Sequence, residues 1–320
     1  IAIAKAEFEG QNVSSLSVPA NPKRAYTISI RKEGERRGTN YLINPYSGEV
    51  LGDTSTSSSE FFMTMFRLHR WLMLDTSIGR PIVGWATIIF VLLTITGMVI
   101  WFPQKVKAWR QGLKIKWSGN WKRINHDLHN ALGFYSCIFL LVMGLTGLQW
   151  SFDWYRTGLY NVLGVDRSTR APQEEQKPEV SYEGQTVLSM EATLAKATEV
   201  LDYDGNYRIS IPNDEATSVN INKSKIGFFA PSGSDNITLN RYTGAVEDKN
   251  IFSEKPFNER VGSSIKALHM GYVFGTFSKI LYFITCLIAT SLPVTGTIIW
   301  VNKLKKKSAR KKKGKLKQRY

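Results

Sequence analysis

Three stretches of about 20 residues without Asp, Glu, Lys or Arg restrict the fold of this chain more than any other feature. They are Ile82 to Phe102, Leu132 to Phe152 and Ile280 to Val301. An α-helix of about 20 apolar residues can cross roughly 30 Å of hydrocarbon. The mean hydropathy of the chain is only −0.19, because polar segments separate the apolar ones. We therefore predict three membrane helices in the 320 residues.

The net charge of +16 is concentrated beside these helices. Seven basic residues lie between Trp101 and His126 and eleven lie from Lys303 to Tyr320, with no acidic residue in either segment. Such segments mark the cytoplasmic side, so residues 1–60 and 154–258 are predicted to lie outside. Nucleic-acid binding is the competing explanation of a pI near 9.7, but basic helix ends need only anionic lipid. We expect the lipid bilayer, and no nucleic acid, as a partner.

A histidine followed by an apolar run and a Thr-Gly pair occurs three times. The copies run from His69 to Thr96-Gly97, from His129 to Thr146-Gly147 and from His269 to Thr295-Gly296. The predicted topology places His69 and His269 on the outer side, and His126 and His129 on the inner side. All four histidines of the chain thus lie near a membrane boundary, where ionisable groups are costly and usually functional.

The two outer segments resemble each other. In each, a strand-like run leads into a Tyr-Ser-Gly or Tyr-Thr-Gly turn, as expected for a hairpin whose glycine takes a positive φ. The turns are Pro45-Tyr46-Ser47-Gly48-Glu49-Val50 and Arg241-Tyr242-Thr243-Gly244-Ala245-Val246. Helical stretches are predicted at 1–9 and 190–201, and strands at 26–30, 41–43, 207–211, 218–221 and 238–240. We predict two small α+β modules, with residues 167–183 as a flexible linker into the second.

The order of these elements resembles the PepSY-associated transmembrane proteins over essentially the whole chain. The residues that carry the resemblance are the two turns, Asp127-Leu128-His129, Leu132-Gly133-Phe134-Tyr135, and Leu268-His269-Met270-Gly271 with Phe274-Gly275. The resemblance implies a multi-pass protein of the bacterial inner (cytoplasmic) membrane, with two periplasmic α+β PepSY-like modules on a membrane α-helical bundle. Family members usually begin with a further membrane helix headed by a histidine. We therefore expect a fourth, N-terminal helix to be missing from this chain.

The expected domains follow from this organisation. They are a truncated first module at 1–60, a membrane helix with a periplasmic extension at 61–103, a basic cytoplasmic loop at 104–125, a membrane helix at 126–153, the second module with its linker at 154–258, a membrane helix at 259–302 and a basic cytoplasmic tail at 303–320.

The histidines are candidate haem ligands. A single histidine at a helix end is usually an interfacial polar group, but the repetition of the histidine at several helix ends favours a functional role. Zinc requires additional Cys, Asp or Glu ligands on one side, whereas bis-histidine haem requires one histidine from each of two helices at similar depth. His69 and His269 meet that requirement on the outer side, and we expect them to ligate one haem iron.

The inner histidines need a partner from elsewhere. His126 and His129 are three residues apart on one helical face, so they cannot lie on opposite sides of one haem. The resemblance implies that His129 ligates an inner haem together with a histidine from the missing helix. His126 is the weaker candidate, because a neighbouring or interfacial role also fits it. Two b-type haems are the expected cofactors.

Several other residues have two interpretations. Gly133, Gly271 and Gly275 fit either close approach of a macrocycle or ordinary helix packing, and the Thr-Gly pairs are expected to be packing or helix-end features. Cys137 and Cys286 are expected to be buried free thiols. Aromatic and basic residues of the outer modules fit either reception of an anionic complex or core packing and solvated surface. These are Tyr26, Arg31, Arg36, Arg37, Tyr41, Phe228 and Phe229.

The resemblance implies a haem-dependent oxidoreductase that reduces a periplasmic ferric siderophore from Fe(III) to Fe(II) and so releases the iron. No flavin or nicotinamide motif is evident, so the electron donor is expected to be a quinol or a separate cytosolic reductase. One alternative is a non-redox PepSY module that binds or regulates a peptidase, with the helices as an anchor. Another is a component of metal or haem transport.

Overall fold

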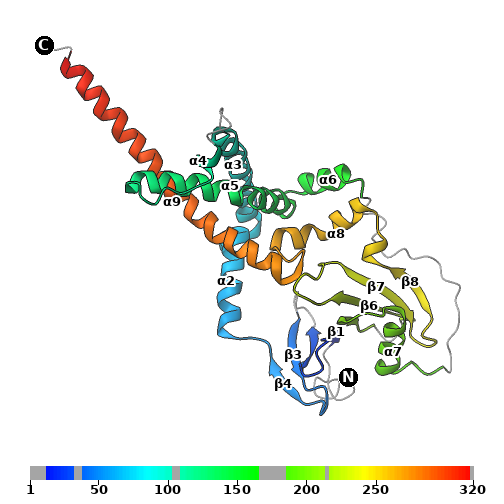
Figure 1. Cartoon of the computed structure of the whole chain (residues 1–320). Coiled ribbons are helices and arrows are strands. Elements are labelled where there is room, and N and C mark those ends of the chain that lie inside the picture. The colour runs from blue at the N-terminus through cyan, green and yellow to red at the C-terminus, as the bar shows by residue number, and fades with distance from the viewer. Residues whose placement is uncertain (1–11, 32–37, 103–108, 166–184, 213–215, 318–320) are drawn as a thin grey trace. The chain divides into compact units, whose positions relative to one another are not determined.

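The computed structural model describes residues 12–31, 38–102, 109–165, 185–212 and 216–317. The chain divides into two compact units (Figure 1). The sheet unit comprises Ile1–Leu74, Thr157–Ala267 and Tyr272–Thr276. The membrane unit comprises Asp75–Arg156, Leu268–Gly271 and Phe277–Tyr320.

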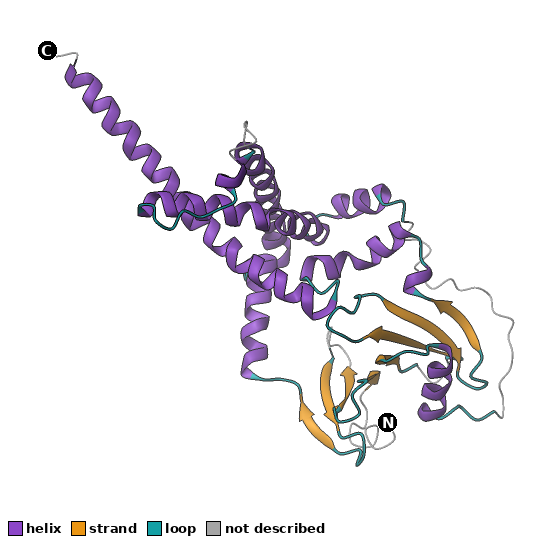
Figure 2. Cartoon of the chain, in the orientation of Figure 1, coloured by secondary structure: helices purple, strands orange, loops and turns teal. Residues whose placement is uncertain are grey.

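The sheet unit contains one antiparallel sheet of eight strands in the order β4-β3-β2-β1-β5-β6-β7-β8 (Figure 2). The strands are β1 (Asn12–Val18), β2 (Tyr26–Arg31), β3 (Thr39–Ile43), β4 (Val50–Asp53), β5 (Gly205–Ser210), β6 (Ser218–Lys225), β7 (Ser234–Asn240) and β8 (Val246–Asn250). Each half is a meander of four strands, and β1 pairs with β5 between them, with Leu16 opposite Ile209. The predicted modules are thus joined in a single sheet, because β1 and β5 satisfy each other's edge hydrogen bonds.

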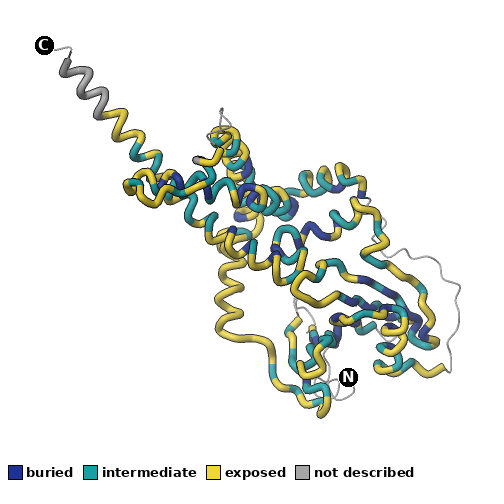
Figure 3. The backbone as a smooth tube through the Cα atoms, in the orientation of Figure 1, coloured by how far each residue is buried: buried dark blue, intermediate teal, exposed yellow. Residues whose placement is uncertain are grey.

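The core of the sheet unit lies on one face of this sheet. Alternate strand residues are buried there, which follows from the two-residue period of a strand. The buried set is Val13, Leu16, Ile28, Ile30, Ile43, Ile209, Val219, Ile221, Ile237 and Leu239, with Ala197 and Leu201 from the region of α7 (Met190–Val200). Figure 3 shows this buried stripe along β6 and β7.

Both predicted hairpin turns are confirmed. Gly48 has φ 76° and Gly244 has φ 71°. In each turn an asparagine side chain accepts backbone N–H groups, Asn44 from Tyr46 at 2.9 Å and Asn240 from Tyr242 at 3.0 Å. The predicted strands are also present. Strand β1 was not predicted, and the helix predicted at 1–9 and the linker predicted at 167–183 lie outside the described residues.

Three helices of the membrane unit are long and apolar enough to cross a membrane, which confirms the central prediction. They are α3 (Thr76–Trp101), α5 (Trp121–Gly147) and α9 (Gly275–Lys317). The 3-10 turn η2 (Leu148–Trp150) continues α5. The remaining helices are α2 (Ser57–Trp71), α4 (Trp109–Gly112), α6 (Asp153–Val162), η4 (Phe252–Glu254) and α8 (Phe257–Met270).

The helix boundaries differ from the predicted ones. The segment 61–103 is two helices rather than one, because Leu72 takes the left-handed conformation and its N–H bonds to Arg67 and Leu68 carbonyls. Likewise, Gly271, with φ 76°, separates α8 from α9. Helix α5 starts five residues before 126, where the Asn120 side chain caps it. The predicted tail continues α9 as far as Lys317.

Glycines bring α3 and α5 close together. A Cβ on Gly144 of α5 would lie 2.7 Å from Val91 Cγ2 of α3, and one on Gly84 would lie 2.6 Å from the Phe152 ring. The Trp101 and Phe134 rings stack with centroids 4.2 Å apart. Small residues let helix backbones approach in this way within lipid, and they fix the position of α5 beside α3.

Candidate functional site

His269 lies in the last turn of α8 and contacts the C-terminal end of α5. Its Nδ1 is 2.9 Å from the Met143 carbonyl oxygen and 3.3 Å from Thr146 Oγ1. The ring makes an edge contact with Trp150 at 5.0 Å between centroids. A Cβ on Gly147 would be 3.0 Å from His269 Cε1. We call His269, Met143, Thr146, Gly147 and Trp150 the His269 site.

His129 lies inside α5, near its N-terminal end, and contacts α9. Its Nδ1 is 2.9 Å from Thr295 Oγ1, and a Cβ on Gly296 would be 3.1 Å from His129 Cε1. The Asn125 side chain donates to the Thr295 carbonyl at 3.1 Å. We call His129, Asn125, Thr295 and Gly296 the His129 site.

The two sites occupy opposite ends of the α5–α9 pair. Between them the helices touch where Gly133 faces Leu292 and where the Phe139 and Tyr282 rings meet at 5.7 Å. Thr146 follows His129 by 17 residues in the sequence, which is roughly 26 Å of α-helix and close to the thickness of the hydrocarbon. Helix α5 therefore supplies a histidine near one end and a Thr-Gly pair at the other, whereas His269 comes from α8 and Thr295-Gly296 from α9.

His69 lies in the last turn of α2 and is exposed. It precedes the turn that ends α2 rather than heading the membrane helix, which corrects the predicted position. His269 stands in the corresponding place before Gly271. Since His69 belongs to the sheet unit and His269 to the membrane unit, their pairing across one haem stays a prediction.

His126 is directed to neighbouring polar groups of α5. Its Nδ1 is 3.3 Å from Asn130 Nδ2 and 3.6 Å from Asp127 Oδ1. Its side chain is 49% exposed, whereas that of Asp127 is 4% exposed. A structural role beside Asp127 accounts for these contacts, and ligation by His126 stays a prediction.

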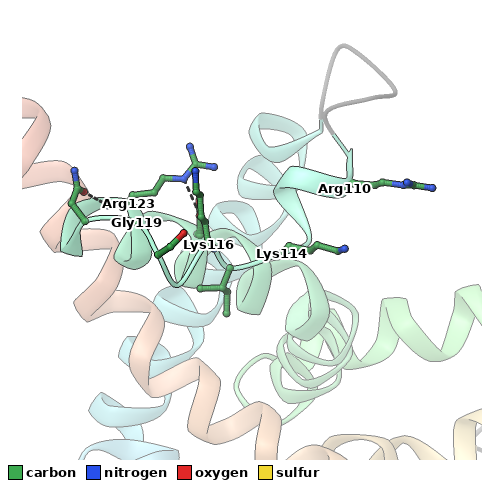
Figure 4. A pocket seen from close by; sticks show the side chains of 9 residues that line it. Arg110, Lys114, Lys116, Gly119 and Arg123 are labelled. Atoms are coloured by element: carbon green, nitrogen blue, oxygen red, sulfur yellow. Dashed lines mark hydrogen bonds and ion pairs between the residues drawn. The ribbon is translucent and has the colours of Figure 1, made fainter.

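Asp127 organises the basic loop that precedes α5. Its carboxylate accepts from Arg123 Nε at 2.9 Å and from the Lys116 backbone N–H at 3.2 Å. Beside it is an open cavity of about 730 Å³ (Figure 4). The described side chains lining the cavity are Arg110, Lys114, Ile115, Lys116, Ser118, Asn120, Arg123 and Asp127, with Gly119. This excess of positive charge suits the phosphate groups of lipid.

The glycines near the histidines contact protein atoms. A Cβ on Gly271 would be 2.3 Å from the Tyr282 ring, and one on Gly275 would be 2.8 Å from the Gly227 carbonyl oxygen. Gly133 is in ordinary contact range of Leu292, at 3.8 Å. Of the two interpretations given above, turn formation and packing account for these contacts.

The remaining candidates are not members of either histidine site. Tyr26 and Tyr41 pack against the sheet core. Phe228 and Phe229 are exposed on the loop after β6, and Arg31 is exposed at the end of β2, while Arg36 and Arg37 lie outside the described residues. Cys137 is a buried free thiol, as predicted. Cys286 is free but exposed, because it lies on α9, few of whose apolar residues are covered by protein.

Sequence analysis missed the contact between histidines and Thr-Gly pairs. The pairs were interpreted as packing or helix-end features, and the structure shows that two of the three receive a histidine ring. The available signal was the recurrence of a Thr-Gly pair at the far end of each apolar run. Among the described residues, no three His, Cys, Asp or Glu side chains gather as a metal-ligand group.

Three apolar helices and one antiparallel sheet define a multi-pass membrane protein with a separate sheet-containing unit. Its sequence matches the family described as the PepSY-associated TM region over residues 2–303. The chain therefore belongs to this family, which confirms the resemblance. No curated protein matches the chain with significance.

Proposed function

We propose that this protein is a di-haem b-type reductase of the bacterial inner membrane, with its sheet unit in the periplasm. Electrons would pass from a quinol or a cytosolic reductase, through the membrane unit, to a periplasmic ferric siderophore. The observation that carries the proposal is the pair of histidine sites at opposite ends of α5, one formed with α9 and one with α8. One reduced haem equivalent supplies the single electron that converts chelated Fe(III) to Fe(II).

The chemistry of the two sites fits haem. In both, Nδ1 contacts a protein oxygen at 2.9 Å, an arrangement typical of metal-ligating histidines, which hold their second ring nitrogen in a hydrogen bond. The separation of roughly 26 Å along α5 is appropriate for one haem near each face of the bilayer. Bound haem would supply one-electron transfer between the ferric and ferrous states.

Bis-histidine haem would require a second histidine at each site. We propose His69 as the partner of His269, and a histidine from a further membrane helix as the partner of His129, as the family resemblance implies. The basic loop beside Asp127 supports placing the His129 site toward the cytoplasmic face, because Lys and Arg are enriched there. The His269 site then lies near the periplasmic face, where the electron acceptor would bind.

The test is a count of haem per chain by pyridine haemochrome on full-length protein purified from haem-sufficient cells. We expect two b-type haems, a bis-histidine spectrum, and oxidation of the dithionite-reduced protein by ferric siderophores. A colourless protein would contradict the proposal and favour a binding or regulatory module. Haem that is present but transported across proteoliposomes without redox change would favour transport instead.

A further inference from the structure

The three Thr-Gly pairs share one hydroxyl arrangement. Each threonine Oγ1 lies within hydrogen-bond distance of the carbonyl oxygens three and four residues earlier in its own helix. The contacts are Thr96 to Leu92 at 2.8 Å and Leu93 at 3.2 Å, Thr146 to Val142 at 2.5 Å and Met143 at 3.3 Å, and Thr295 to Ser291 and Leu292, both at 3.1 Å. A hydroxyl has one proton, and either carbonyl oxygen can accept it. When the proton is given to the helix backbone, the threonine oxygen acts as an acceptor toward a neighbouring group.

This arrangement fixes the proton of His129. With the Thr295 proton on a carbonyl of its own helix, the 2.9 Å contact between Thr295 Oγ1 and His129 Nδ1 is a hydrogen bond that the imidazole donates. In a neutral imidazole only one nitrogen carries hydrogen. Nδ1 is then the protonated nitrogen, and Nε2 carries the lone pair that can bind a metal.

His269 reaches the same state through a different acceptor. Its Nδ1 is 2.9 Å from the Met143 carbonyl oxygen, and a carbonyl can only accept. Thr146 Oγ1, at 3.3 Å, adds a second acceptor on the same side of the ring. Loss of the Thr146 hydroxyl would therefore leave the Met143 contact of His269, whereas loss of the Thr295 hydroxyl would remove the 2.9 Å contact of His129 Nδ1.

The glycine of each pair makes room for the ring. Cβ atoms on Gly147 and Gly296 would approach the imidazole Cε1 to 3.0 and 3.1 Å, which is closer than ordinary van der Waals contact. Any larger side chain would push the ring away from its threonine. The threonine hydroxyl thus accepts a hydrogen bond from the imidazole, and the glycine leaves the space that the imidazole occupies.

We propose that Thr295-Gly296 and Thr146-Gly147 are positioning elements that hold His129 and His269 as the Nδ1–H tautomer and offer Nε2 to the iron. The identity of the metal rests on the proposed function, while the tautomer and ring position do not. Neighbouring groups of this kind typically change metal affinity by about 10- to 100-fold when removed.

The first experiment compares Thr295→Val and Thr146→Val with Thr290→Val. Thr290 is exposed on α9 and its hydroxyl donates to Leu287 at 2.7 Å, so it is a matched control without a histidine. We expect Thr295→Val to speed haem loss to an apo-globin acceptor about 10-fold or more and to shift the midpoint potential of one haem. Thr146→Val should have a smaller effect, and Thr295→Ser should restore wild-type behaviour. Equal behaviour of Thr295→Val and Thr290→Val would overturn the proposal.

The second experiment measures the ring nitrogens directly. With four histidines in the sequence, ¹⁵N-histidine spectra of the full chain without haem can be assigned through single His→Gln variants. We expect protonated Nδ1 at His129 and His269, and a change at His129 in Thr295→Val. An Nε2–H tautomer at His129 in the wild type would overturn the positioning role. A protein that shows Nδ1–H but never binds haem would retain the positioning role and refute the proposed function.

Discussion

Two arms of the molecule share one sequence repeat but are used differently. In the second arm, α8 and α9, His269 contacts the end of α5 and Thr295-Gly296 receives His129, so both ends of the repeat are docked on α5. In the first arm, α2 and α3, no described atom beyond the helix's own backbone lies within 4 Å of a Cβ placed on Gly97. Within the described residues, a Thr-Gly pair is therefore not sufficient to place a histidine ring beside it.

The difference lies in how each membrane helix meets α5. Helix α3 packs on α5 through Val91, and Gly84 contacts Ser151 and Phe152 just beyond the end of α5. Both residues lie in the apolar run of the repeat and not at its histidine or its Thr-Gly pair. Helix α9 meets α5 through the repeat itself. Helix α3 thus contacts α5 by side-chain packing alone, whereas α9 also contacts the His129 ring of α5. Variants can separate these two kinds of contact.

The largest effect is expected from the histidines. If the proposed function holds, His269→Ala should remove one haem per chain and leave the other, because the ring would hold that haem, and His129→Ala should remove the second. His69→Ala should remove the same haem as His269→Ala. Pyridine haemochrome gives the count per chain, with Thr290→Val on α9 as the control that keeps both haems. Full occupancy in every variant would show that the ligand assignment is wrong.

The next largest effect is expected at the Thr-Gly pairs. It should distinguish the two pairs that contact a histidine ring, Thr146-Gly147 and Thr295-Gly296, from Thr96-Gly97. Gly296→Leu and Gly147→Leu should displace His129 and His269 respectively, since even a Cβ would be 3.1 and 3.0 Å from the ring, and each should lower the occupancy of one haem. Gly97→Leu should leave both occupancies unchanged. The Soret absorbance per chain measures this. A loss in Gly97→Leu as large as in Gly296→Leu would abolish the distinction between the arms.

The helices could be predicted from the sequence because apolar length is a local property. The three uncharged stretches predicted α3, α5 and α9, and the Tyr-Ser-Gly and Tyr-Thr-Gly turns predicted hairpins whose glycines have φ 76° and 71°. The breaks at Leu72 and Gly271 were not predicted. Leu72 has a left-handed φ of 56°, which a leucine rarely adopts and no local pattern signals.

The pairing of elements could not be predicted in the same way. Strand β1 contains three serines and is defined as a strand by its partners β2 and β5, which lie far apart in the sequence. The contact of His129 with Thr295 joins residues 166 positions apart. Periodicity identifies which residues are apolar or polar on an element, but it does not identify which partner they meet.

A smaller effect concerns the segment between α8 and α9 within the sheet unit. Gly275 has φ 58°, and a Cβ there would lie 2.8 Å from the Gly227 carbonyl oxygen and 2.9 Å from that of Phe228. Gly275→Ala should destabilise this contact by about 1–3 kcal/mol. Hydrogen exchange at Ser232, whose N–H donates to Val273 at 3.0 Å, should become faster. Gly158→Ala on α6, with nothing within 4 Å, should leave Ser232 unchanged.

The smallest effect is expected at the start of α3, where the first arm has a feature that the second lacks. The pKa of Asp75 is held below its usual value by hydrogen bonds from the Ser77 hydroxyl and backbone N–H. The carboxylate therefore stabilises the helix start above the unfolded pKa of about 3.8, and this contribution is lost as the pH falls through the folded pKa. Amide hydrogen exchange at Ser77, corrected for the intrinsic exchange rate, should become faster as the pH falls through the folded pKa of Asp75.

Asp75→Asn provides the matched control, because asparagine still caps a helix but does not titrate. Exchange at Ser77 in this variant should not depend on pH over the same window. Helix α9 has no acidic residue in its first turn, so its first amides should also be insensitive to pH. If acid loosened both helix starts equally, the cause would be general unfolding, and the two arms would not differ in how their membrane helices begin.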